Sequence, residues 1–327
     1  MHRSLLVLVG ALAFGACQSA ADTSTDAADG TEETAAEAPE TDAAYEAAAD
    51  SSLAAVEGDL DASRIVVLGG PITETVYALG LGDNVVASDQ SSLFPAGVMQ
   101  KPRLNYFRQT SAEGVLAQEP TVVLASDGTG PPDVLDQIRA TGVTVVTVPS
   151  PETVAGAYGR VQMLGRALGR EAQADSLVST MQDQLAEASA LQPDTPPRAL
   201  FVYARGAGLV QVLGTETTAS LVLQLAGAEN AAGIPENAPL TAEAVVAAAP
   251  DVVVIPSRGL DSIGGPDGLF AQPGLAQTPA GENRRVVAVD DALLLGLGPR
   301  LGEAIQELAR GLSAPAAEAV PTETASL

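Results

Sequence analysis

The chain has 327 residues, of which 46% are apolar, and its 41 acidic side chains against 16 basic ones give a formal net charge of -25. This apolar content suffices for the core of one large or two medium domains, whereas the negative charge excludes nucleic acid as a partner. The only His is His2 and the only Lys is Lys101, which lies in Gln-Lys-Pro. If residues 1–16 are removed as an export signal, no His remains, which excludes histidine-based triads, dyads and metal sites. The context of Lys101 excludes a phosphate-binding loop.

Residues 1–16 are typical of an export signal, because His2 and Arg3 precede an apolar run too short to span a bilayer. Small residues then lead to Cys17, and this pattern resembles the lipobox of bacterial lipoproteins, in which the cysteine is lipidated. Phe14 stands where that motif usually has Leu. The alternative is an ordinary signal peptide that contains a cysteine. We expect lipidation at Cys17 and an extracytoplasmic, lipid-anchored protein.

Both ends of the mature chain differ from its middle in composition. Residues 17–63 are rich in Ala, Thr, Asp and Glu, with thirteen acidic residues and no basic one. Such a segment buries too little apolar surface to fold, so it is predicted to be an extended tether. The tail 313–327 is similar and is also predicted to be disordered.

Between residues 64 and 312, short β-branched runs alternate with helical spacing, which is typical of α/β layers. The predicted domains are an N-terminal α/β lobe (64–150), a helical region (151–196) with one or two helices, the later one long, and a C-terminal α/β lobe (197–312). The predicted strands are 64–68, 84–88, 121–125, 144–148, 199–203, 251–255 and 285–289.

The two lobes contain a near-repeat. TSAEGVLAQEPTVVL, which contains Glu113, is similar to LTAEAVVAAAPDVVV, which contains Glu243, 130 positions later. In each copy a Ser/Thr-x-Glu opens a short helix, a Pro ends it and a buried strand follows. This is good capping chemistry for any helix, but one copy in each lobe favours a duplicated architecture.

Five segments resemble the haem-binding proteins of bacterial haem ABC importers, whose wider family also binds ferric siderophores and cobalamin. They are RIVVLGGPITETVYALGLGDNVVASD, LNYFRQTSAEGVLAQEPTVVLAS, GPPDVLDQIRATGVTVVTVP, TAEAVVAAAPDVVVIPSRGLDSIGG and VVAVDDALLLGLGPR. The resemblance implies two α/β lobes joined by a long, rigid backbone helix, with the ligand in the cleft between them. It also implies that the protein is a binding protein rather than an enzyme and that it is a monomer. Such a protein captures haem and passes it to a permease and its ATPase.

Within this resemblance, Tyr106 in Leu-Asn-Tyr-Phe-Arg-Gln matches the axial ligand of the haem iron. A phenolate is a hard oxygen donor that suits Fe(III). Some relatives add a His from the second lobe, near the segment that contains Tyr203, but this chain has none there. We expect five-coordinate haem bound by Tyr106, with Tyr203 as a weaker candidate for a second donor. Haem is the only cofactor expected, as transported ligand, and no other metal.

Haem brings two propionates, whose charges need guanidinium partners inside an acidic protein. Arg108 follows the proposed ligand by two residues, and Arg258 follows a predicted strand of the second lobe. The resemblance implies that Arg258 approaches the ligating Tyr and favours its phenolate form. Arg205 is a weaker candidate for the same cleft.

The resemblance also assigns permease docking to one acidic residue on each lobe, here Glu113 and Glu243. Two alternative functions remain. GLGLGD and LLLGLGPR are Gly-rich, but neither completes a dinucleotide-binding fingerprint, so a nucleotide-using enzyme is disfavoured. A ferric siderophore or cobalamin binding protein of the same transporter class is the closer alternative.

Overall fold

The structure is a computed structural model that describes residues 42–56, 60–206, 208–290 and 296–314. The predicted signal peptide, Cys17, the tether up to residue 41 and the tail from residue 315 lie outside the described residues. Within the described ranges, no helix is long and apolar enough to cross a membrane.

The N-terminal lobe is built on a four-stranded parallel sheet with the order β2-β1-β3-β4. Its strands are short and rich in valine, and the two central ones are almost wholly buried, as expected of a parallel sheet covered on both faces. All four strands lie where the sequence predicts them. The elements of this lobe are β1 (Ile65–Leu68), α2 (Gly70–Ala78), η1 (Gly82–Asn84), β2 (Val85–Ser88), η2 (Ala96–Gln100), η3 (Phe107–Gln109), α3 (Ala112–Leu116), β3 (Val122–Ser126), α4 (Val134–Arg139) and β4 (Thr144–Val148).

The C-terminal lobe has a mixed six-stranded sheet in which β5 pairs in parallel with β9 and antiparallel with β6. The three longer parallel strands, β5, β9 and β10, confirm the sequence prediction. The other three have only two or three residues each and were not predicted. The elements are β5 (Arg198–Ala204), β6 (Val210–Val212), α7 (Thr218–Leu225), β7 (Glu229–Asn230), β8 (Ala238–Pro239), α8 (Ala242–Ala248), β9 (Val252–Pro256), α9 (Ser257–Ser262), α10 (Gly265–Phe270), η4 (Leu275–Gln277), α11 (Pro279–Glu282) and β10 (Val286–Val289).

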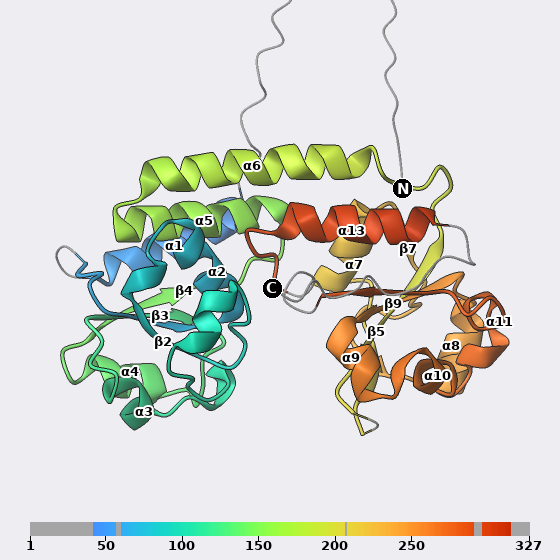
Figure 1. Ribbon diagram of the computed structural model, residues 1–327, viewed down its shortest axis with the longest axis horizontal. Coiled ribbons are helices and arrows are strands. Elements are labelled where there is room, and N and C mark those ends of the chain that lie inside the picture. The colour runs from blue at the N-terminus through green and yellow to red at the C-terminus, as the bar shows by residue number, and fades with distance from the viewer. Residues whose placement is uncertain (1–41, 57–59, 207, 291–295, 315–327) are drawn as a thin grey trace, which may run out of the picture. The chain divides into compact units, whose positions relative to one another are not determined.

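Three helices connect the lobes: α5 (Val154–Leu168), α6 (Glu171–Ser189) and α13 (Leu301–Ser313). In Figure 1, α6 lies along both α5 and α13, which cover the two lobes. Glycines permit both close approaches. A Cβ on Gly165 would lie 2.5 Å from Cβ of Ala174, and one on Gly302 would lie 2.3 Å from Cβ of Gln184. The predicted helical region is therefore two helices, and the third, α13, was not predicted.

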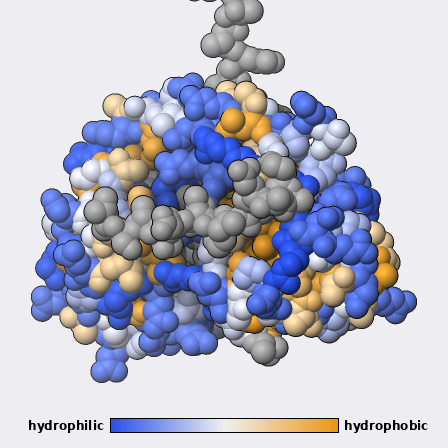
Figure 2. Space-filling model, turned by 45° about the vertical axis from the view of Figure 1, so that its right-hand side comes forward, coloured by the Kyte–Doolittle hydropathy of each residue, from blue (hydrophilic) through white to orange (hydrophobic). Residues whose placement is uncertain are grey.

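One apolar core runs through these helices into both lobes. Its fully buried members include Val67 of β1, Leu164 of α5, Met181 of α6, Phe201 of β5 and Ile305 of α13. The outer surface contrasts with this core, since the face drawn in Figure 2 is mostly hydrophilic. The lobes therefore share buried surface although they share no sheet.

The tether prediction is wrong for residues 43–54, which form helix α1 (Ala43–Ala54). Asp42 caps this helix by accepting a hydrogen bond from the Tyr45 N–H, and it also accepts one from the Thr153 hydroxyl. Tyr45 and Ala49 are buried against the lobe, and the Tyr45 hydroxyl donates to the Pro149 carbonyl. The acidic composition concealed a strongly helix-forming, alanine-rich segment.

The two copies of the near-repeat have the same local structure. Ser111 caps α3 and Thr241 caps α8, each by accepting a hydrogen bond from the backbone N–H three residues later. In each copy the residue before the terminating proline has a positive φ, 48° at Glu119 and 41° at Ala249. The following strands occupy interior positions of the two sheets. This agreement in detail supports the duplicated architecture.

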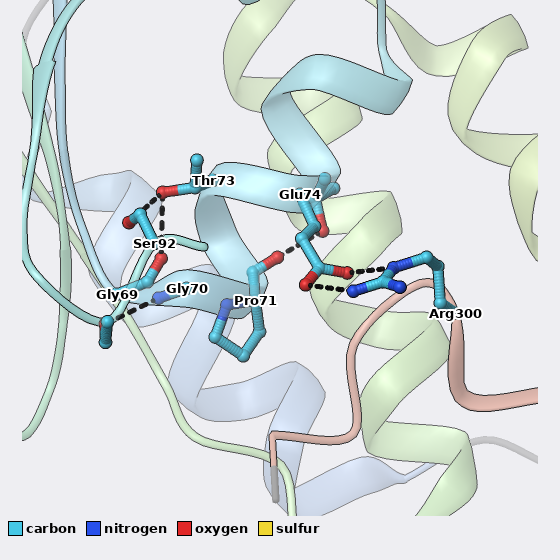
Figure 3. A network of polar contacts seen from close by, with 9 residues as sticks. Gly69, Gly70, Pro71, Thr73, Glu74, Ser92 and Arg300 are labelled. Carbon is cyan, nitrogen blue, oxygen red and sulfur yellow. Dashed lines mark hydrogen bonds and ion pairs between the residues drawn. The ribbon is translucent and has the colours of Figure 1, made fainter. Parts of the chain in front are cut away.

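A buried ion pair links helix α2 of the N-terminal lobe to the start of α13. The Arg300 guanidinium donates to both carboxylate oxygens of Glu74, at 3.0 and 2.9 Å, as Figure 3 shows. The side chains are 17% and 4% exposed, and the Arg300 Cζ lies 3.6 Å from the ring centroid of Phe94. Nearby, the buried Arg160 of α5 donates to the Gly296 and Leu297 carbonyls. Polar contacts thus join the chain before α13 to the N-terminal lobe.

Burial disfavours the charged forms of Glu74 and Arg160. It raises the pKa of Glu74, although Arg300 and Arg160 act in the opposite direction. Burial likewise lowers the pKa of Arg160 to about 10. The Glu74–Arg300 pair therefore fixes how α2 and the start of α13 lie against each other more than it adds net stability, which is typical of buried ion pairs.

We predict that Glu74→Ala lowers the free energy of unfolding by about 3 to 5 kcal/mol, because Arg300 loses its buried partner. The double variant Glu74→Leu/Arg300→Met replaces both charges with apolar groups and should recover most of that loss. Denaturant titration of the three proteins measures both effects. A double variant as unstable as the single one would contradict this account of the pair.

Candidate functional site

Tyr106 lies in the segment that follows β2 and η2 at the edge of the N-terminal lobe. It directly precedes η3, and its ring is half-buried. The Phe107 ring lies 4.6 Å from the Tyr106 ring, centroid to centroid, at an interplanar angle of 60°. This edge-to-face arrangement is a favourable one for aromatic pairs. The Tyr106 side chain therefore has a defined support on its own lobe.

The C-terminal lobe contributes Tyr203 and Arg205 at the end of β5. The Arg205 Cζ lies 5.7 Å from the centroid of the Tyr106 ring and 5.9 Å from that of Tyr203. One guanidinium thus lies near two tyrosine rings of different lobes, within the range of cation–π attraction. The structure brings these three predicted residues together, with the guanidinium of Arg205, the weaker candidate in the sequence, beside the Tyr106 ring.

The turn that carries Arg205 is tied to helix α9. The Gly206 N–H donates to the Ser262 hydroxyl at 2.9 Å, and that hydroxyl donates to the Gly259 carbonyl at 2.7 Å. Arg258 lies on the same short helix and its side chain is exposed. Arg258 and Arg205 therefore belong to neighbouring elements of one lobe.

Arg108 lies beside the ring of Phe107. Its Cζ lies 5.1 Å from the Phe107 ring centroid, and a Cβ on Gly128 would lie 3.4 Å from its Nη1. The side chain is exposed. Arg108 thus packs beside the support of Tyr106, and its charged end remains accessible.

Glu113 and Glu243 lie apart from this group, each in the first turn of its helix, and both are exposed. An acidic side chain there interacts favourably with the helix dipole. Their carboxylates are accessible to a partner, and each occupies the same place in its copy of the near-repeat.

Sequence reasoning missed Asp89 beside the site, and it also missed the structural ion pair of Glu74 and Arg300. Asp89 follows β2 directly, is fully buried and accepts a hydrogen bond from the Phe107 N–H, next to Tyr106. A polar residue after a buried parallel strand was the available signal, since such edges commonly form sites. An acid among the apolar residues of α2 was the signal for Glu74.

A pocket of about 390 Å³ lies elsewhere, between α1, α5 and α6. Its lining includes Glu46, Asp50, Arg166 and Glu171, and Arg166 forms an exposed ion pair with Asp50. None of the predicted site residues lines this pocket. It belongs to the packing of α1 on the helices rather than to the group around Tyr106.

The fold and these residues can be compared with known proteins. The sequence matches the periplasmic binding protein family over residues 65–293, and the chain belongs to this family. Two lobes joined by helices, with side chains from both lobes meeting at Tyr106, agree with that assignment.

One similar solved structure is the periplasmic heme-binding protein RhuT from Roseiflexus sp. RS-1 in apo form, with 40% identity and a TM-score of 0.74. The alignment covers 78% of this chain and 98% of that one. The ABC transporter substrate-binding lipoprotein YvrC of Bacillus subtilis is 29% identical over 76% of this chain and 79% of its own. The cobalamin-binding protein of Halobacterium salinarum is 27% identical, over 80% and 72% respectively.

Proposed function

We propose that this chain is the extracytoplasmic receptor of a haem ABC importer, which binds haem between its lobes and is not an enzyme. The observation that carries the proposal is the approach of Arg205 to Tyr106 from the opposite lobe, in a chain 40% identical to a periplasmic heme-binding protein. The alternative ligand within the family is cobalamin, which the more distant relative from Halobacterium supports.

Tyr106 fits the chemistry of ferric haem. Its phenolate would supply the hard oxygen donor that Fe(III) prefers. Tyr203, whose ring centroid lies 5.9 Å from the Arg205 Cζ, is the candidate for a second donor. The arginines can neutralise the negative charge of the ligand. Arg205 can pair with the phenolate or a propionate, and the exposed Arg108 and Arg258 can pair with propionates.

We predict that the purified protein gives a Soret band on titration with haemin, whereas cobalamin is not bound. Tyr106→Phe removes only the phenolic oxygen, so it should abolish the phenolate-to-iron charge-transfer band. It should also weaken haemin binding about a hundredfold, or about 2.8 kcal/mol.

Two further tyrosine variants serve as controls. Tyr158→Phe changes a half-buried tyrosine of α5 and should leave the spectrum unchanged. Tyr203→Phe tests the second donor and should alter the spectrum less than Tyr106→Phe does. An unchanged charge-transfer band in Tyr106→Phe would refute the assignment of the ligand.

We propose that Glu113 and Glu243 dock the two lobes onto basic residues of the permease. Both are exposed, and both belong to equivalent helices of the two lobes. Two contacts on separate lobes would fix the orientation of the receptor over the transport path. Such pairs act through charge complementarity and are individually weak, about 0.2 to 1 kcal/mol.

We predict that single changes of Glu113 or Glu243 to Ala mildly reduce haemin-stimulated ATP hydrolysis by the reconstituted transporter, and that the double change reduces it further. Haemin binding should remain normal. The matched control is Glu171→Ala/Glu303→Ala, which removes exposed first-turn acids from α6 and α13. Equal stimulation by both double variants would leave Glu113 and Glu243 with helix stabilisation only.

We further propose that the receptor is a monomer anchored through lipid on Cys17. A similar lipoprotein of Bacillus subtilis supports this location. Mass spectrometry of the protein from membranes should find a diacylated or triacylated Cys17 at the amino terminus, and Cys17→Ser should release the protein from the membrane. A mature chain that begins beyond residue 17 without lipid would refute the anchor.

A further inference from the structure

Asp89 is a fully buried carboxylate that directly follows β2. Oδ1 accepts hydrogen bonds from the Gly69 N–H at 3.0 Å and the Ser92 hydroxyl at 2.9 Å. Oδ2 accepts from the Ser91 N–H at 2.9 Å and the Phe107 N–H at 3.1 Å. A carboxylate has about four lone-pair positions, so its hydrogen-bonding capacity is filled. Four donors in fixed directions give this side chain a single orientation.

The place of Asp89 in the fold explains how its charge is tolerated. Gly69 is the N-cap of α2, so the positive end of that helix dipole faces the carboxylate. The backbone N–H of Asp89 donates to the Val67 carbonyl of β1, which fixes the main chain as well. Thr73 and Ser92, joined by a 2.7 Å hydrogen bond, continue the network into α2, as Figure 3 shows. The carboxylate thus belongs to the rigid edge of the sheet.

The bond to Phe107 matters because of the peptide group to which it belongs. The Phe107 N–H and the Tyr106 C=O form one planar unit. The N–H donates to Asp89, and the C=O accepts from the Gln109 N–H at 2.7 Å. With both polar ends bonded, the plane cannot rotate without losing a hydrogen bond. The orientation of that plane sets the direction in which the Tyr106 side chain leaves the backbone.

We propose that Asp89 is the positioning residue of the tyrosine site: its Oδ2 holds the Tyr106–Phe107 peptide so that the Tyr106 ring lies beside Arg205 of the other lobe. The inference rests on the proposed haem site for its functional consequence. Its structural part, the immobilised peptide, rests on the two hydrogen bonds alone and can be tested without haemin. Groups that orient a metal ligand typically contribute about 10- to 100-fold to metal affinity.

Replacing Asp89 by Ala and replacing it by Asn should have different effects. Asp89→Ala removes the acceptor of the Phe107 N–H. Asp89→Asn can keep a carbonyl oxygen at the Oδ2 position and turn its NH2 group toward the Ser92 hydroxyl, which can accept as well as donate. The Asn variant then loses mainly the bond to Gly69. Positioning therefore predicts rescue by Asn, whereas a requirement for negative charge predicts that Asn and Ala are equally impaired.

The experiment compares wild type, Asp89→Ala, Asp89→Asn and Glu74→Gln, which changes another buried carboxylate of the same lobe. Hydrogen exchange of the ligand-free proteins measures protection of residues 104–110, and haemin titration measures affinity and the charge-transfer band. We expect Asp89→Ala to lose protection there, to bind haemin about 10- to 100-fold more weakly and to shift the band. Asp89→Asn should retain most of each property, and Glu74→Gln should leave the spectrum unchanged.

The outcomes distinguish the positioning role of Asp89 from a requirement for its charge, and they separate both from the proposed haem site. Loss of protection with an unchanged haemin spectrum would overturn the positioning role, as would unchanged protection in Asp89→Ala. Equal impairment of the Asn and Ala variants would replace positioning by charge. If Asp89→Ala does not fold, Asp89→Asn decides: near wild-type protection of residues 104–110 and near wild-type haemin affinity support positioning, whereas loss of both supports a requirement for negative charge. A wild-type protein that does not bind haemin would refute the haem site, while hydrogen exchange would still test the immobilised peptide.

Discussion

The site depends on the packing of one helix against two others. Tyr106 and Arg205 belong to sheets that share no strand, so their 5.7 Å approach requires the lobes to be held at a set distance. Helix α6 provides this by packing closely on α5 of one lobe and on α13 beside the other, through Gly165 and Gly302. Protein interiors resist compression. A ligand that enters between the lobes therefore meets side chains whose separation is largely predetermined.

The strands could be predicted because they are buried on both faces and consist mainly of β-branched residues, the pattern that distinguishes parallel sheets. Strands β6, β7 and β8 could not, since two or three residues carry no periodicity. Helix α1 was misjudged for a physical reason. Its acidic residues indicated solvation, but buried Tyr45 and Ala49, together with the hydrogen bond from Thr153 to Asp42, attach this alanine-rich helix to the lobe.

The residues of the candidate site likewise differ in whether the sequence could predict them. Tyr106 was found through a local motif and its resemblance to a family, not through any periodicity. The partners of that tyrosine come from the other lobe and from the end of β2, and those contacts depend on tertiary packing. The pairing of Glu74 with Arg300 spans 226 positions. The sequence shows that Glu74 is a charged residue among apolar neighbours, but only the fold shows that Arg300 is its partner.

The burial of the Glu74–Arg300 pair has a consequence for life at different ionic strengths. Dissolved ions screen charges that water reaches, with a Debye length of about 8 Å at physiological salt, and affect buried pairs much less. The contact between α2 and α13 should therefore persist in brine and in dilute medium alike. Exposed carboxylates such as those of Glu113 and Glu243 have no such protection. Under the docking role proposed for these two residues, salinity would tune how readily the receptor meets its membrane partner, whereas the contact between α2 and α13 would stay the same.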